Sequence, residues 1–189
     1  MCIRDSRYSV PKFFDIFNSL FFDDVLKHCH IKTTKRNEEN DDIDGQCTSH
    51  QSPEDLEVKQ IVQIEIVQST IGLSPTVRLS HYLGVLIHEM LHASFCLFAC
   101  YCGTRCTEPY HSSDGAGRTG HGIAWQNAAS AIVSFIKGDT RLRSRIMSLN
   151  RALSLAIEIQ KSHLFEDYLP YIEGWSLDPQ EIEDTAMYE

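Results

Sequence analysis

Residues 84–95 read GVLIHEMLHASF and contain the pattern HExxH, formed by His88, Glu89 and His92 within an apolar stretch. Apolar residues recur here every three or four positions, which predicts an amphipathic helix that begins near Ser80 and runs to Phe95. Side chains four residues apart on a helix point in the same direction, so His88 and His92 share one face. The question that this stretch raises is whether the two histidines bind a metal or match the pattern by chance.

A catalytic zinc site needs three protein ligands and one open position for water. His88 and His92 supply two of these ligands. Glu89 follows the first ligand and stands beside the metal rather than on it, where it can move a proton from the bound water to a leaving amine. The pattern therefore predicts the site of a zinc metallopeptidase, and the alternative is a chance HExxH inside a buried helix.

The third ligand has one leading candidate, His121, in the stretch GRTGHGIAWQ at residues 117–126. The longer pattern HExxHxxGxxH fails because Phe95 and Phe98 occupy its last two positions, and this excludes a metzincin. His121 is flanked by two glycines that allow a tight turn, and an apolar helix is predicted to follow from Ile123 to Gly138. The lesser candidates are Glu108, His111 and Asp114.

Three motifs in this order resemble those of the SprT-like zinc metalloproteases, the family of the Spartan or SprT-type domain. They are FFDIFNSLFFDDVL at 13–26, which matches the family pattern FxxFNxxFFxxxL, then HEMLH at 88–92 and GHG at 120–122. The resemblance covers about residues 11–136. It departs from many relatives in having no CxxC zinc ribbon after residue 122, and the segment between His92 and His121 is longer and richer in cysteine than the family leads us to expect.

The resemblance implies an α+β, zincin-like metallopeptidase domain with a small sheet, an HExxH active-site helix and a following ligand-bearing helix. It also implies Zn²⁺ as cofactor, His88, His92 and His121 as its ligands, and Glu89 as the catalytic residue. The implied function is zinc-dependent endopeptidase activity, including action on DNA-bound or crosslinked proteins and hence a role in DNA repair. The alternative is a catalytically inactive module, stabilised by zinc, that binds DNA or another protein.

The domain is expected to span residues 7–163, because MCIRDS at the start looks like a translated sequencing adapter and we exclude it from the fold. A helix behind Pro11 and strands at 28–34 and 61–67 precede the HExxH helix, and a long helix at 140–163 follows the Ile123 helix. The segments 35–57 and 164–189 are rich in acidic residues. We expect a mobile insertion at 35–57 and a loosely ordered tail at 164–189.

The net charge of −9 is unevenly distributed along the chain. Residues 166–189 carry −8 and residues 36–57 carry −7, so the remainder carries about +6. A mildly basic remainder is compatible with DNA nearby, but its charge is much lower than the strongly basic charge that indicates DNA binding. No run of about 18 apolar residues predicts a membrane span, and no secretory signal is evident. We expect an intracellular protein, with a nuclear location as one option.

Four of the seven cysteines fall within a Cys-rich loop expected at 96–119. Their spacing, C-x₃-C-x-C-x₃-C, matches no standard zinc knuckle. Three interpretations remain open: reduced thiols packed at a helix end, a disulfide, or a second structural zinc that includes His111. The four residues are Cys96, Cys100, Cys102 and Cys106.

Overall fold

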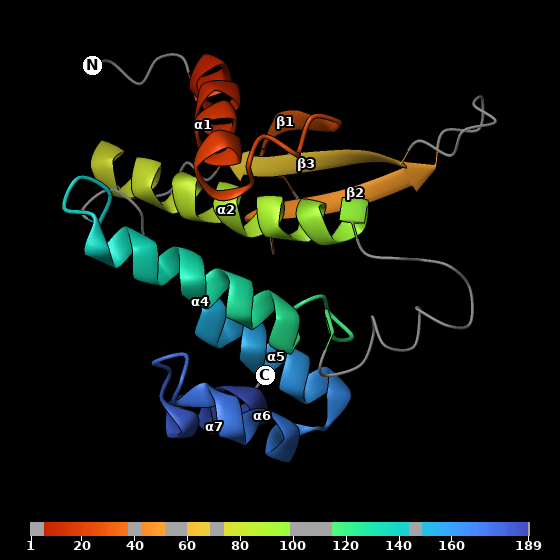
Figure 1. Ribbon diagram of the computed structural model, residues 1–189, viewed down its shortest axis with the longest axis vertical. Helices are drawn as coiled ribbons and strands as arrows, with labels where there is room; N and C mark the ends of the chain where they lie inside the picture. The colour runs from red at the N-terminus through yellow and green to blue at the C-terminus, as the bar shows by residue number, and fades with distance from the viewer. Residues whose placement is uncertain are drawn as a thin grey trace. The chain divides into compact units, whose positions relative to one another are not determined.

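The computed structural model describes residues 6–37, 43–51, 60–68, 74–98, 115–143 and 149–188. The described residues confirm the expected α+β class, with a sheet of three strands and six helices (Figure 1). The chain divides into two compact units. The sheet unit comprises Met1–Phe98 and Gly138–Met147, and the helical unit comprises Ala99–Lys137 and Ser148–Glu189.

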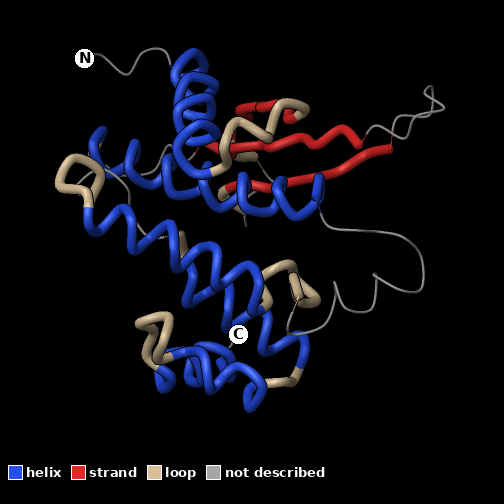
Figure 2. Tube along the Cα trace, in the orientation of Figure 1, coloured by secondary structure: helices blue, strands red, loops and turns tan. Residues whose placement is uncertain are grey.

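The sheet consists of β1 (Cys29–Lys35), β2 (Gly45–Gln51) and β3 (Gln60–Gln68), in the spatial order β1-β3-β2. β1 pairs with β3 in parallel, and β2 pairs with β3 in antiparallel orientation. The strands are coloured red in Figure 2. The central strand β3 is rich in β-branched residues, and Val62, Ile64 and Ile66 are almost completely buried. Strands of this composition are typical of a sheet interior covered by helices.

The expected mobile insertion at 35–57 is wrong for residues 45–51, which form β2. The sequence GQCTSHQ has no large apolar side chain, so its pattern gives no strand signal. As an edge strand, β2 is held by its ladder to β3 and by contact with α2 rather than by large side chains of its own. A Cβ at Gly45 would lie 2.6 Å from the Val85 side chain, so a small residue allows this close approach.

Two helices cover the sheet: α1 (Ser6–Phe21) packs against β1 and α2, and α2 (Pro75–Phe98) packs against β2 and β3. α1 begins five residues before the expected start at Pro11. α2 begins five residues before Ser80, because Ser74 accepts a hydrogen bond from the Val77 amide and Pro75 occupies the first helical position. The long α2 carries the HExxH pattern in its second half.

The helical unit contains α4 (Ile123–Gly138, whose last residue belongs to the sheet unit), α5 (Arg151–Ser162), α6 (Phe165–Ile172) and α7 (Pro179–Tyr188). α4 begins at Ile123, as predicted. The next helix was expected at 140–163, whereas α5 begins at Arg151. Asn150 adopts a left-handed conformation with φ of 51°, which Asn tolerates better than most residues and which no helix continues through.

The tail at 164–189 was expected to be loosely ordered, and this expectation is wrong for the described residues. It forms α6 and α7, whose apolar side chains build the core of the helical unit with α5. The acidic residues misled the prediction, since they lie mostly on exposed faces while the apolar residues recur at helical spacing. The core cluster consists of Ile123, Leu155, Ile159, Tyr168, Ile172, Trp175 and Ile182.

Within the described ranges, no helix is long and apolar enough to cross a membrane.

Candidate metal centre

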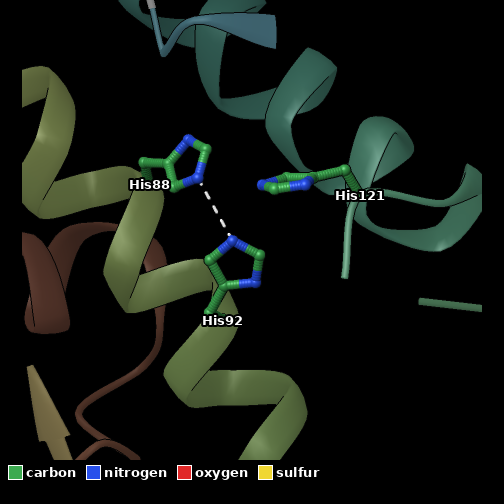
Figure 3. A group of neighbouring side chains, drawn as sticks. All are labelled: His88, His92 and His121. Carbon is green, nitrogen blue, oxygen red and sulfur yellow. Dashed lines mark hydrogen bonds between the residues drawn. The ribbon is translucent and has the colours of Figure 1, made fainter. Parts of the chain in front are cut away.

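His88 and His92 lie one helical turn apart on α2 and turn their rings toward each other. Their Nε2 atoms are 3.1 Å apart, and the rings meet edge to face with centroids 4.9 Å apart (Figure 3). Both side chains are half-buried, whereas the neighbouring Ile87 and Leu91 are buried. The buried apolar residues of α2 therefore fix the turn of helix that carries the two half-buried histidines.

His121 lies in the loop 115–122, directly before α4. The loop is closed by hydrogen bonds from the Gly122 amide to the Ala116 carbonyl, at 2.6 Å, and from the Ala124 amide to the Gly115 carbonyl, at 3.1 Å. The ring of His121 meets Trp125 edge to face at 4.9 Å, and Trp125 is fully buried in α4. The helix and the closed loop together restrict the direction in which the His121 ring points.

The ligand atoms of His88, His92 and His121 all lie within 4.8 Å of one another, and Figure 3 shows the three rings pointing toward a common point. Two nitrogens bound to one tetrahedral zinc, each at about 2.0–2.1 Å, are about 3.3 Å apart. The separation of 3.1 Å between the Nε2 atoms of His88 and His92 is close to that value. The three histidines could thus hold a metal ion.

Glu89 is buried, with 6% of its surface exposed. Burial raises the pKa of its carboxyl to about 8, because the charged form loses its hydration. A divalent cation bound by the adjacent histidines would favour the charged form. The side chain lies beside β2: a Cβ at Gly45 would meet the Cγ of Glu89 at 3.1 Å. Sequence reasoning did not find this neighbour, because β2 has no recognisable strand pattern.

Sequence reasoning also missed two residues that support His121, one within its loop and one on α5. The Thr119 hydroxyl lies 3.0 Å from Nδ1 of His121. The Glu158 carboxylate, on α5, accepts hydrogen bonds from this hydroxyl and from two backbone amides of the loop. Glu158 is far away in sequence and stands in an ordinary helical pattern, so only the fold brings it to the loop.

Cys96 lies in the last turns of α2, beside Cys47 of β2. Hydrogen bonds from Cys47 and Ser49 lower the pKa of the Cys96 thiol to about 7, although burial acts in the opposite direction. The Cys47 thiol, which donates to Cys96 and is itself half-buried, has a raised pKa. The other expected members of the Cys-rich loop, and the lesser ligand candidates, lie outside the described residues: Cys100, Cys102, Cys106, Glu108, His111 and Asp114.

The basic residues that follow α4 differ in their surroundings. Arg141 is exposed and forms an ion pair with Asp139 at 2.7 Å. Arg151, in contrast, is buried: its guanidinium donates to Gln126 and to the Trp175 carbonyl, and burial lowers its pKa to about 10. Arg151 therefore stabilises the interior of the helical unit and is not part of a basic surface.

No protein-family model, curated protein or solved structure matches this chain.

Proposed function

We propose that the protein is a zinc-dependent endopeptidase of the SprT-like type, with a zincin-like arrangement of α2 and the sheet. The observation that carries the proposal is the convergence of His88, His92 and His121, whose ligand atoms lie within 4.8 Å of one another. Two of these residues belong to an HExxH pattern on a helix, and the intervening Glu89 is the residue that such sites use for proton transfer.

The donor set favours zinc over harder cations. Imidazole nitrogens are ligands for zinc and other transition metals, whereas magnesium and calcium prefer oxygen ligands. Three protein ligands leave a fourth position open, which distinguishes a catalytic zinc site from a structural one with four. The combination of three histidines and a neighbouring carboxyl therefore supports a hydrolytic site.

In this proposal each residue has a distinct role. His88, His92 and His121 hold the zinc. Zinc held there would supply Lewis-acid chemistry, which polarises a carbonyl and makes water acidic near neutral pH. Glu89 would accept a proton from that water and deliver it to the leaving nitrogen, which is the general acid–base task of a carboxyl beside a metal site. The buried position of Glu89 keeps competing water away from the transferred proton.

The substrates that we propose are proteins, including proteins bound or crosslinked to DNA. The DNA-related part comes from the motif resemblance. The concentration of negative charge in 36–57 and 166–189 leaves the rest of the chain at about +6, which allows a DNA-bound substrate to approach.

The test compares Glu89→Gln with the parent protein and with Glu65→Gln. Glu65 is a carboxylate of similar burial on β3 that contacts Lys32 and Gln46, so the control makes the same chemical change elsewhere in the sheet unit. We expect Glu89→Gln to retain zinc and lose cleavage of an unfolded protein substrate by about 100-fold or more, since general acid–base catalysis contributes about that much. Glu65→Gln should cleave like the parent.

Each assay is run without DNA, with single-stranded DNA and with double-stranded DNA. Parental activity in Glu89→Gln would overturn the proposed mechanism. Zinc binding with no cleavage by the parent under any of the three conditions would overturn the peptidase and favour the non-catalytic, zinc-stabilised binding module.

A further inference from the structure

Glu158 is a buried carboxylate in the middle of α5 that faces the His121 loop. Its side chain is completely buried. Oε1 accepts a hydrogen bond from the Arg118 amide at 2.7 Å, and Oε2 accepts one from the Thr119 amide at 2.7 Å and one from the Thr119 hydroxyl at 2.6 Å. Short bonds to an ionised acceptor are among the stronger hydrogen bonds in proteins.

The loop is shaped to receive this carboxylate. Gly117 has a φ of +80°, and a Cβ at this position would lie 2.5–2.7 Å from the carboxylate atoms of Glu158. Only glycine both adopts this backbone conformation readily and leaves room for the carboxylate. The two successive amides of Arg118 and Thr119 then point at one anion, which is the arrangement of an anion-binding nest.

The hydrogen-bond directions determine which nitrogen of His121 carries the proton. The Thr119 hydroxyl has one hydrogen, and it donates this hydrogen to Glu158. Its oxygen can therefore only accept from Nδ1 of His121, which lies 3.0 Å away. Nδ1 then carries the proton, and Nε2 of His121 retains the lone pair that a metal needs.

We propose that Glu158 is a positioning residue which acts through the Thr119 hydroxyl to hold His121 in the Nδ1–H tautomer with Nε2 presented to the metal. The proposal rests on the metal centre of the proposed function, and it does not depend on peptidase activity. Metal-binding histidines commonly donate their second N–H to an outer partner that sets the ring orientation and increases the basicity of the ligand. Here the partner is a hydroxyl that is polarised by a buried carboxylate.

The positioning role can be separated from the structural role of Glu158. The two amide bonds to Glu158 stabilise the loop backbone and do not involve the Thr119 side chain. The Thr119 hydroxyl connects Glu158 to His121. Thr119→Val has nearly the same shape, keeps both amides and removes the connection, whereas Thr119→Ser keeps the hydroxyl. The matched control is Thr185→Val in α7, where the lost hydroxyl donates to the Glu181 carbonyl.

The first readout uses metal-free protein. The side-chain ¹⁵N resonances of His121 report which ring nitrogen is protonated, and they are assigned by comparison with His121→Ala. We expect a single Nδ1–H tautomer in the parent, in Thr119→Ser and in Thr185→Val. In Thr119→Val we expect a mixture of both tautomers, because the acceptor for Nδ1–H is gone.

The second readout is the dissociation constant for Zn²⁺, together with the visible spectrum of the Co²⁺-substituted protein. We expect Thr119→Val to bind Zn²⁺ about 10- to 100-fold more weakly, the usual effect of removing an outer-shell partner. Thr119→Ser should bind as the parent does. Circular dichroism and urea unfolding of each variant show whether the fold is retained.

Parent-like ¹⁵N resonances and Zn²⁺ affinity in a folded Thr119→Val would overturn the positioning role while leaving the three-histidine site intact. A parent protein that binds neither metal would overturn the site and the positioning role together. Tautomer and affinity changes in a protein without peptidase activity would support the positioning role and contradict only the enzymatic part of the proposed function.

Discussion

The Nε2 atoms of His88 and His92 lie 3.1 Å apart on adjacent turns of α2. At this distance one neutral imidazole can donate an N–H to the other, or both nitrogens can direct their lone pairs at a shared cation. The ligand atoms of His121 lie within 4.8 Å of those of this pair, which adds a third nitrogen to the same group. The pair therefore favours metal binding over a chance pattern.

We expect the purified protein to contain about one zinc per chain, and the variant His121→Ala to lose it or bind it much more weakly. Three ligands define a catalytic site, and removing one leaves two. A ligand at 100 times its dissociation constant adds about 2.7 kcal/mol to the free energy of unfolding. Zinc should therefore raise the melting temperature of the parent and not that of the variant. A folded parent without zinc would contradict this, while two zincs of which one is lost would point to a second site.

The elements around the site could be predicted from the sequence, because their periodicity is strong. The HExxH helix, the strand around 61–67 and the helix from Ile123 were all placed by alternating or helical apolar patterns. The distances between the three histidine rings could not be predicted. Sequence spacing suggested His121 as a ligand, but only the fold brings its ring nitrogens within 4.8 Å of those of His88 and His92.

The predictions that differ from the structure, for β2, α5 and the tail, do so for specific physical reasons. β2 carries no large apolar residue, so its identity depends on pairing with β3, which is a long-range interaction. The start of α5 depends on the left-handed conformation of Asn150, which interrupts an otherwise continuous helical pattern. The prediction for the tail at 164–189 relied on its acidic composition and overlooked its apolar spacing. Tyr168, Ile172 and Trp175 recur at intervals of four and three residues, as on a helix face, and are buried.

Gly122→Ala should destabilise the His121 loop and weaken zinc binding. A Cβ at Gly122 would lie 2.6 Å from the Gly115 carbonyl oxygen and 2.6 Å from the Gly117 nitrogen, and backbone atoms cannot move aside as a flexible side chain can. We expect a cost of about 1–3 kcal/mol in urea unfolding. Gly138→Ala is the control, since a Cβ there meets nothing within 4 Å. Equal stability of both variants would show that the loop is not closed as described.

The order of the C-terminal segment can be tested by Ile182→Ala. Ile182 is completely buried in the core cluster of the helical unit, and its truncation should lower the free energy of unfolding by about 2–5 kcal/mol. Met187→Ala lies on the same helix, but 65% of Met187 is exposed, so it should change stability by about 0.5 kcal/mol or less. If both variants unfold like the parent, α7 does not contribute to the core.

Cys96 should be the thiol that reacts most readily among those described. Its pKa of about 7 arises mainly from the hydrogen bond donated by Cys47, whereas burial raises the pKa of Cys29 to about 11. Because the thiolate is the reactive form, alkylation of Cys96 by iodoacetamide should increase with pH around a midpoint near 7.

Cys47→Ala removes the donor, so it should raise the pKa of Cys96, move the midpoint to higher pH and slow alkylation at neutral pH. Cys47→Ser retains a donor and should keep the midpoint close to that of the parent. Peptide mapping by mass spectrometry distinguishes Cys96 from the other cysteines. An unchanged Cys96 profile in Cys47→Ala would mean that the two thiols do not interact.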